Sequence, residues 1–192
     1  MPCKDDKPKD AVISPFQASS DYFVSAKWMV MGGGVCLDNR FKRNEMLIKE
    51  TGQAALSAAS VIVFGVGGVG SSAVESLARS GVGHFTLVDS DVVDVTNINR
   101  QLLAVTDTVG KPKVSVQAER IRAINPEAQV LEKQMFYLPE NADEIDLSKY
   151  DYIIDAIDTV SAKIELIVRA NKAGVPIISC MVRATSSIRN SS

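Results

Sequence analysis

Four glycines in this sequence, Gly65, Gly67, Gly68 and Gly70, follow a short β-branched run and open a stretch with apolar residues at helical spacing (residues 61–80). A strand, a glycine turn and a helix make the phosphate-binding unit of doubly wound α/β folds. Glycine lets the backbone come close to a ligand, and the helix N-terminus offers unpaired N–H groups. Gly65, Gly67 and Gly70 fit the pattern G-x-G-x-x-G. The spacing predicts a nucleotide-binding loop, and a purely structural glycine turn is the alternative.

Polar residues after a second apolar run, 85–88, extend this prediction. Asp89 ends that run where related folds hold a ribose with an acidic side chain, although a turn aspartate would also fit. Asn97 and Asn99 can donate hydrogen bonds to phosphate or ribose oxygens. Arg100 carries a planar donor fork that suits phosphate. Such a density of amide and cationic groups indicates a binding segment rather than a plain loop.

Lys113 and two carboxylates, Asp155 and Asp158, complete the candidate site. Lys113 opens a predicted helix, where the dipole disfavours a cation, so an anionic partner and a merely solvated lysine stay equally open. Asp158 follows an apolar run, and ligands of open α/β sheets bind at the carboxyl ends of strands. A carboxylate facing polyphosphate is repelled unless Mg²⁺ lies between them, so Asp158 is interpreted as a magnesium ligand or as the N-cap of the next helix. Asp155 is interpreted as structural.

Alternating strands and helices must position these residues. We expect an α/β fold: a Rossmann-like, doubly wound, mostly parallel sheet with helices on both faces and an N-terminal helical extension. The expected strands are 61–64, 85–88, 129–133, 152–155 and 176–179. The expected helices are 40–50, ended by Thr51 and Gly52, then 54–59, 71–80, 114–124, a short one at 140–146, and 159–173.

The composition is typical of an ordinary globular protein, with 192 residues, 46% of them hydrophobic, and a net charge of −2. This charge argues against a broad basic surface for nucleic acid, although a local patch stays possible. The sequence has no apolar run of membrane-spanning length and no recognisable signal peptide, so we expect a cytoplasmic protein. Cys3, Cys36 and Cys180 lie far apart and form no C-x-x-C pair, which predicts reduced thiols and no structural zinc. Cys180 is interpreted as a small residue ending a strand rather than a nucleophile.

Six short motifs, in order, resemble the adenylating domain of ubiquitin-activating-like enzymes, the ThiF/MoeB/HesA family. They are Arg40-x-x-Arg43, Gly65-x-Gly67-Gly68-Val69-Gly70-Ser71, Asp89-x-Asp91-x-Val93, Asn97-x-Asn99-Arg100-Gln101, Gly110-x-Pro112-Lys113 and Asp155-x-x-Asp158. The resemblance covers residues 40–181. Within the family, the segments 80–83, 94–101, 125–127 and 155–163 look most like the tRNA threonylcarbamoyladenosine dehydratase branch. That branch uses ATP to activate the carboxylate of a modified tRNA adenosine, and internal attack then closes a ring with overall loss of water.

The resemblance implies ATP and Mg²⁺ as cofactors and a role for each candidate residue. It implies that Gly68 admits the nucleotide, that Asp89 holds the ribose, and that Asp158 holds Mg²⁺. Asn97, Arg100 and Lys113 would hold the phosphates and stabilise charge as pyrophosphate leaves. Arg43, which alone could simply belong to a solvated helix face, would reach the phosphates of the neighbouring subunit in a homodimer. The implied nucleotide-binding set is Gly65, Gly67, Gly68, Gly70, Asp89, Asp91, Asn97, Asn99, Arg100, Lys113 and Asp158, and the implied catalytic set is Arg43, Arg100, Lys113 and Asp158.

We expect three segments: a poorly ordered or atypical N-terminal extension (1–39), the ATP-binding adenylating domain (40–181) and an aberrant tail (182–192). The branch typically continues Met-Gly-Ala-Gly-Asn-Lys-Leu-Asp-Pro, whereas this chain continues Met-Val-Arg-Ala-Thr-Ser-Ser-Ile-Arg from residue 181. Loss of one G from one possible coding of the first sequence produces the second. We therefore hypothesise that the tail is translated out of frame and that the protein is truncated, with weak or absent turnover. A divergent tail is the alternative, and sequencing the gene tests it.

Three other functions stay open. A sulfur-carrier protein adenylyltransferase, acting on the C-terminus of a ubiquitin-like partner, also adenylates a carboxylate. A nicotinamide-dependent dehydrogenase would use the glycine loop and Asp89, but it would leave Arg100, Lys113 and Asp158 without a role. A non-catalytic nucleotide-binding remnant is the third. The leading hypothesis remains an adenylating enzyme whose partner is tRNA carrying threonylcarbamoyladenosine.

Overall fold

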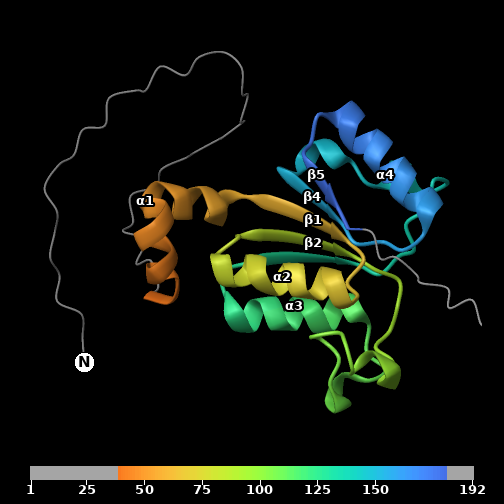
Figure 1. Cartoon of the computed structure of the whole chain (residues 1–192), viewed down its shortest axis with the longest axis horizontal. Helices are drawn as coiled ribbons and strands as arrows, with labels where there is room; N and C mark the ends of the chain where they lie inside the picture. The colour runs from red at the N-terminus through yellow and green to blue at the C-terminus, as the bar shows by residue number, and fades with distance from the viewer. Residues whose placement is uncertain (1–38, 181–192) are drawn as a thin grey trace, which may run out of the picture. The chain divides into compact units, whose positions relative to one another are not determined.

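The computed structural model describes residues 39–180 (Figure 1). The expectations for Cys3, Cys36, the extension before residue 39 and the tail 182–192 lie outside the described residues. No helix of the described part combines the length and the apolar character that crossing a membrane requires.

The described chain contains one five-stranded sheet, in which all neighbouring strands are parallel and the order is β3-β2-β1-β4-β5. This order reverses between β1 and β4, and such a switch point is where open α/β sheets bind ligands. The fold class predicted from the sequence is confirmed. The strands are β1 (Ser60–Phe64), β2 (His84–Val88), β3 (Gln129–Lys133), β4 (Tyr152–Asp155) and β5 (Ile177–Ser179).

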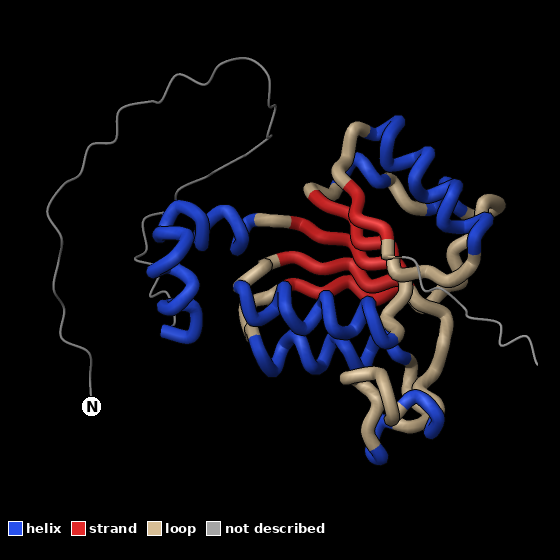
Figure 2. Tube along the Cα trace, in the orientation of Figure 1, coloured by secondary structure: helices blue, strands red, loops and turns tan. Residues whose placement is uncertain are grey.

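Strand β1 is apolar after Ser60 because helices cover both faces of the sheet. Side chains alternate between the faces of a strand, so Val61 and Val63 pack with α2 (Gly68–Ser80) and α3 (Lys113–Ile124). Ile62 and Phe64 pack in a second core with α4 (Val160–Ala173). Figures 1 and 2 show α2 and α3 side by side on one face and α4 on the other.

Helix α1 (Lys42–Ala58) precedes β1 and is broken at Lys49, where φ is 63° and ψ is 171°. The prediction of two helical segments is confirmed. The break lies at Lys49 rather than at Thr51 and Gly52, because Lys49 adopts the positive φ that interrupts the helix. The second half of α1 docks on the turn after α2: the Gln53 amide donates to the Ser80 carbonyl at 3.0 Å. The helix expected at 140–146 is wrong in extent, since only Ala142–Glu144 forms a 3-10 turn there.

Candidate functional site

A cleft of about 430 Å³ opens at the carboxyl ends of β1, β2 and β4. Backbone hydrogen bonds continue past these strand ends and align the three loops that follow. The Gly65 N–H donates to the Val88 carbonyl and the Ala156 N–H donates to the Phe64 carbonyl, both at 2.8 Å. Most residues predicted for the site line this one cleft: Gly65, Gly67, Gly68, Asp89, Asp91, Asn97, Arg100, Lys113 and Asp158.

The glycine loop needs glycine at its first and last positions for steric reasons. Gly65 has φ +84°, and a Cβ there would stand 2.7 Å from the Ala156 carbonyl oxygen. A Cβ on Gly70 would stand 1.8 Å from the Gly65 carbonyl oxygen, so Gly70 lets α2 pack directly on the loop. Gly70 is buried and does not line the cleft.

Helix α2 begins at Gly68, earlier than predicted, and no side chain caps it. Its N-cap residue is Gly67, and Gly67, Gly68 and Val69 all line the cleft. The first N–H groups of a helix have no partner within the helix, and the dipole makes this end positive. The cleft therefore contains a backbone site for an anion such as phosphate.

Asp89 connects the end of β2 to the glycine loop. Its Oδ2 accepts the Val66 N–H at 2.6 Å, and its Oδ1 accepts the Asp91 N–H at 2.8 Å. The carboxylate thus stays fixed at the cleft wall while each oxygen keeps a further lone pair for a ligand hydroxyl. Sequence reasoning placed Asp89 at this strand end, but it did not anticipate the hold on the loop.

Lys113 is the first residue of α3, and its side chain is only 6% exposed. Its Nζ lies 2.7 Å from Oδ2 of Asp91, whose side chain is 60% exposed. The question that the sequence left open is thereby decided: Lys113 has an anionic partner and is not merely solvated. The Lys113 ammonium group thus lies at the cleft wall beside the carboxylate of Asp91. Because Asp91 faces solvent, an incoming anion can replace it as the partner of Lys113.

The segment between β2 and α3 brings two more donors to the cleft. Asn97 is buried, and its side-chain oxygen accepts the Asp94 N–H at 3.0 Å, which leaves the NH₂ group as the donating end. Arg100 is held by two contacts of Nη1, at 2.8 Å to the Thr96 carbonyl and 3.0 Å to Oδ1 of Asn99. Asn99 does not line the cleft, so its observed contact is to Arg100.

The two carboxylates at the end of β4 and in the loop after it have different surroundings. Asp155 is fully buried and paired with Lys163 at 2.7 Å, which confirms the structural interpretation of Asp155. Asp158 is exposed at the cleft, and its recorded side-chain contact is the Thr159 hydroxyl at 3.4 Å. The alternative of Asp158 as N-cap of α4 is wrong, because Thr159 occupies the N-cap position.

Asp158 fits a magnesium ion that is coordinated mainly by the phosphates of a bound nucleotide and by water. The described residues contain no group of three or more His, Cys, Asp or Glu side chains that could hold a metal. Mg²⁺ is commonly bound through one or two carboxylates together with substrate phosphates and water, rather than by a protein cage. A single exposed carboxylate facing a phosphate-sized anion site has the right donor chemistry for that mode.

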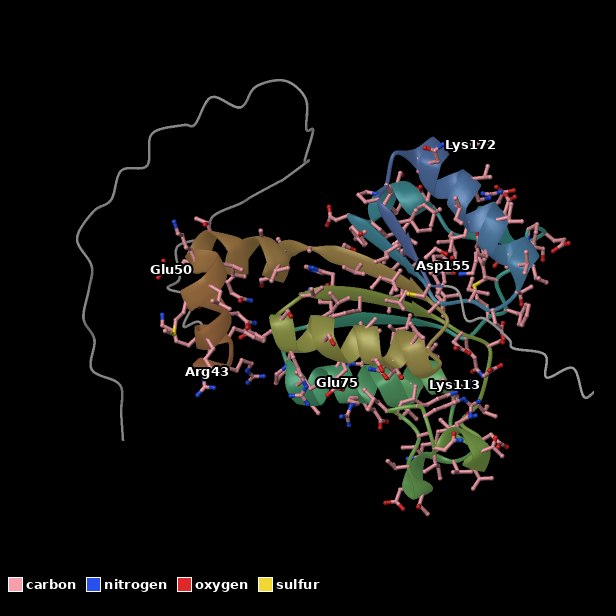
Figure 3. The ribbon with its side chains drawn as sticks, viewed as in Figure 1. Arg43, Glu50, Glu75, Lys113, Asp155 and Lys172 are labelled. Carbon is pink, nitrogen blue, oxygen red and sulfur yellow. The ribbon has the colours of Figure 1, made fainter. Side chains whose placement is uncertain are left out.

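Arg43 lies outside the cleft. It is exposed on α1, beside the amino ends of the strands, and Figure 3 shows it far from Lys113. Neighbouring side chains on the same helix are apolar and exposed, with Met46 at 78% and Leu47 at 85%. Within one subunit, therefore, the structure does not bring Arg43 to the other candidate residues.

An apolar wall of the cleft was missed by sequence reasoning. Met135, Phe136 and Tyr137 follow β3 and line the cleft. The Tyr137 ring meets Phe64 edge-on with centroids 4.7 Å apart, and burial raises the pKa of its hydroxyl to about 12. No motif marks this loop; the sole sequence signal is its position after a strand of the sheet. Gln101, Ile157, Thr159 and Cys180 also line the cleft.

The fold and the cleft define the class of this protein, a Rossmann-like α/β domain with a cleft at its switch point. Residues 41–188 match the model of the ThiF family, and the chain belongs to the ThiF family.

Relatives and a solved structure agree with this assignment. The tRNA threonylcarbamoyladenosine dehydratase of Bacillus subtilis (strain 168) is 49% identical over 143 residues, which cover 74% of this chain and 56% of that protein. The sulfur carrier protein adenylyltransferase of Thermus thermophilus is 36% identical over 142 residues, covering 73% and 52% of the two chains. The crystal structure of E. coli tRNA N6-threonylcarbamoyladenosine dehydratase in complex with ATP matches with a TM-score of 0.69 at 42% identity, covering 73% of this chain and 58% of that one. The chain spans about half the length of the curated relatives it matches.

Proposed function

We propose that this chain binds ATP and Mg²⁺ and forms the adenylating part of a tRNA threonylcarbamoyladenosine dehydratase. The observation that carries the proposal is the convergence of Asp89, Arg100, Lys113 and Asp158 on the cleft at the N-terminus of α2. The ATP complex of the E. coli relative supports the nucleotide. A cytoplasmic location, as expected from the sequence, suits work on tRNA.

Each part of ATP has a complementary part of the cleft. The open N-terminus of α2 at Gly67 and Gly68 offers N–H donors to phosphate oxygens. Asp89 offers acceptor lone pairs to ribose hydroxyls from a fixed position. The apolar wall at Phe136 provides a surface for the adenine ring.

The charge of the reacting groups explains the roles of the remaining cleft residues. Attack of a substrate carboxylate on the α-phosphorus forms a C–O–P bond, breaks the bond to the bridging oxygen and releases pyrophosphate. This step brings two anions together, so donors and cations must surround the reacting phosphate. Arg100, Lys113 and the Asn97 amide supply them, whereas Asp158 would hold Mg²⁺, which supplies Lewis-acid neutralisation of phosphate charge when bound. No protein nucleophile is required for adenylation.

We propose the tRNA-modifying substrate over the sulfur-carrier alternative because identity is higher to the dehydratase, 49% against 36% for the sulfur carrier protein adenylyltransferase. With 21 Lys and Arg against 23 Asp and Glu, the chain has no overall charge that favours RNA. Recognition of tRNA therefore depends on local groups, on a second subunit or on parts of the relatives that this chain does not match.

We also propose a homodimer in which Arg43 serves the partner's cleft. Arg43 is exposed and distant from the cleft of its own subunit, so it can act on phosphate only across an interface (Figure 3). The exposed apolar residues Met46 and Leu47 on the same helix are suited to burial in such an interface.

ATP–pyrophosphate exchange tests the proposed function. The chain is incubated with ATP, Mg²⁺ and labelled pyrophosphate, with tRNA carrying threonylcarbamoyladenosine, with the same tRNA lacking the modification, or with a sulfur-carrier protein ending in glycine. We expect exchange with the modified tRNA alone. Exchange with the carrier protein would support the sulfur-carrier alternative, and ATP binding without any exchange would indicate a non-catalytic remnant. Equal affinity for NAD and ATP would contradict the proposal.

A further inference from the structure

A buried ion pair lies behind the cleft wall, outside the set of residues that face the nucleotide site. Lys163 Nζ and Asp155 Oδ2 are 2.7 Å apart, and their side chains are 9% and 0% exposed. Lys163 lies on α4 and Asp155 ends β4. Figure 3 shows Asp155 in the layer between the sheet and α4. The adenylation step described above uses neither residue.

The pair joins the ends of two strands and a helix. The Ser179 hydroxyl donates to Asp155 Oδ2, and Lys163 Nζ donates to Ser179 Oγ and to the Cys180 carbonyl, both at 3.0 Å. The Cys180 N–H in turn donates to the Asp155 carbonyl at 2.8 Å. All three protons of the ammonium group therefore have acceptors, and the buried charges are fully compensated.

The pair contacts the start of the loop 156–159 directly and reaches its end through α4. At its start, the Ile157 N–H donates to Asp155 Oδ1 at 3.1 Å. At its end, the Lys163 N–H donates to the Thr159 carbonyl at 3.0 Å, which is the ordinary backbone bond of the first turn of α4. The ion pair acts on this end by holding that turn against β4. Asp158 lies between these anchors, and its own recorded side-chain contact is the long one to the Thr159 hydroxyl. The position of Asp158 is therefore set by its loop.

Stability alone does not account for this arrangement. Removing two charges from water carries a large desolvation cost, and well-packed apolar residues often stabilise a fold equally well in such places. An ion pair with bonds to three segments does, however, fix one geometry, because each partner accepts little displacement without losing a bond. The segment so fixed is the one that carries the candidate magnesium ligand.

We propose that Lys163, acting through Asp155, is a positioning residue that holds Asp158 where a magnesium-bound nucleotide needs it. This inference rests on the proposed function in one respect, namely that Asp158 faces a magnesium–ATP complex. It adds a residue that touches neither ATP nor metal.

Magnesium coupling is the measurement that isolates this role. ATP affinity is measured by calorimetry in excess MgCl₂ and in excess EDTA, and the ratio of the two dissociation constants reports how strongly the metal strengthens binding. The test variant is the double change Asp155→Asn with Lys163→Met, which leaves no unpaired buried charge. The matched control is Arg169→Gln, which removes the ion pairs of another α4 residue with Glu165 and Asp143, away from the loop.

We expect the double variant to lower the coupling ratio by roughly tenfold or more, as loss of residues that orient metal ligands does elsewhere, while affinity in EDTA stays unchanged. We expect Lys163→Arg to retain more of the ratio, because it keeps a buried cation, and Arg169→Gln to retain all of it. Hydrogen exchange of residues 156–159 in the nucleotide-free protein is expected to speed up in the double variant alone. A folded double variant with wild-type coupling and wild-type exchange overturns the proposal.

Two results separate this inference from the proposed function. A wild-type chain that does not bind ATP refutes the proposed function, whereas wild-type coupling in the variant refutes the positioning role alone. If the double variant does not fold, Ser179→Ala decides, because it removes a bridging hydroxyl without stranding a charge. A lowered coupling ratio in Ser179→Ala supports the inference, and an unchanged ratio overturns it.

Discussion

Lys113 and Asp91 are joined twice: Nζ of the lysine meets Oδ2 of the aspartate at 2.7 Å, and the Lys113 N–H donates to the Asp91 carbonyl at 3.0 Å. The bridge between Val92 and Pro112 holds the two segments together. Lys113 therefore reaches the cleft as a buried cation whose direction is fixed. Its carboxylate partner faces solvent, so phosphate can take over the interaction without leaving a buried charge behind.

Lys113→Met tests this relationship. A hydrogen bond to a charged group contributes about 1.5–3 kcal/mol, so we expect ATP affinity to fall by roughly ten- to a hundredfold. The fold is expected to survive, because the stranded Asp91 is exposed. Calorimetry gives the affinity, and Lys111→Met, on an exposed lysine of the same turn, is the control. Equal affinity in Lys113→Met and wild type would show that Lys113 serves the fold alone.

Gly65→Ala and Gly110→Ala form a matched pair. The two glycines have nearly the same φ, +84° and +85°, so either substitution costs about 1–2 kcal/mol for the left-handed conformation. A Cβ on Gly65 also overlaps the Ala156 carbonyl at 2.7 Å, whereas Gly110 has nothing within 4 Å. We expect urea unfolding to show a further loss of about 1–3 kcal/mol for Gly65→Ala. Equal losses would contradict the close contact between the loops after β1 and β4.

Tyr137 predicts a stability change at high pH. Burial raises its pKa from 10.0 to about 12, so between these values the unfolded chain releases a proton that the folded chain retains. The contribution is complete below pH 10 and is lost as the pH rises through 12. Tyr137→Phe is expected to flatten this decline and, because the hydroxyl is buried without a partner, to raise the unfolding free energy at pH 7 by about 1 kcal/mol. Denaturant unfolding between pH 9 and pH 12 measures the unfolding free energy as a function of pH, and Tyr152→Phe, on a half-exposed ring, is the control. If the unfolding free energy of wild type and of Tyr137→Phe falls equally steeply with pH, the assignment to Tyr137 is wrong.

If Arg43 serves the partner's cleft, two inactive variants should restore activity to each other when they are mixed. Arg43→Ala and Lys113→Met are each expected to abolish pyrophosphate exchange. When equal amounts are mixed, half of the dimers contain both variants and one of their two clefts is intact, so about a quarter of wild-type activity is expected in a two-fold dimer. A mixture that stays inactive, although the subunits exchange, would show that Arg43 does not serve the cleft of a partner subunit.

The sequence alone predicted the sheet because its strands are short apolar runs bounded by turns. β3 and β4 have the predicted bounds, and β1 and β2 each begin one residue earlier than expected. Asp89 could be placed at the carboxyl edge because it directly follows such a run, and Asp158 because it comes three residues after one. The family assignment from six ordered motifs is confirmed by the match over residues 41–188.

What the sequence did not reveal depends on contacts between distant segments. The Lys163–Asp155 pair forms because α4 folds back over β4 and β5, and sequence reasoning did not identify Lys163 as the partner of Asp155. The wall at Phe136 arises because β3 ends beside the cleft. The break at Lys49 is a positive φ in a residue type that seldom adopts one, so no local pattern predicts it. The magnesium role of Asp158 and the reach of Arg43 remain predictions.

The hydrogen bonds that the Asp89 carboxylate accepts from the Val66 and Asp91 N–H groups have a thermodynamic consequence. The loop is already immobilised when a nucleotide arrives, so association loses little backbone conformational entropy. Binding is then expected to leave the trace of the chain around residues 65–70 unchanged, with an enthalpy dominated by replacing water at the phosphates. The backbone of this region is therefore preorganised, and its free and nucleotide-bound forms are expected to superpose.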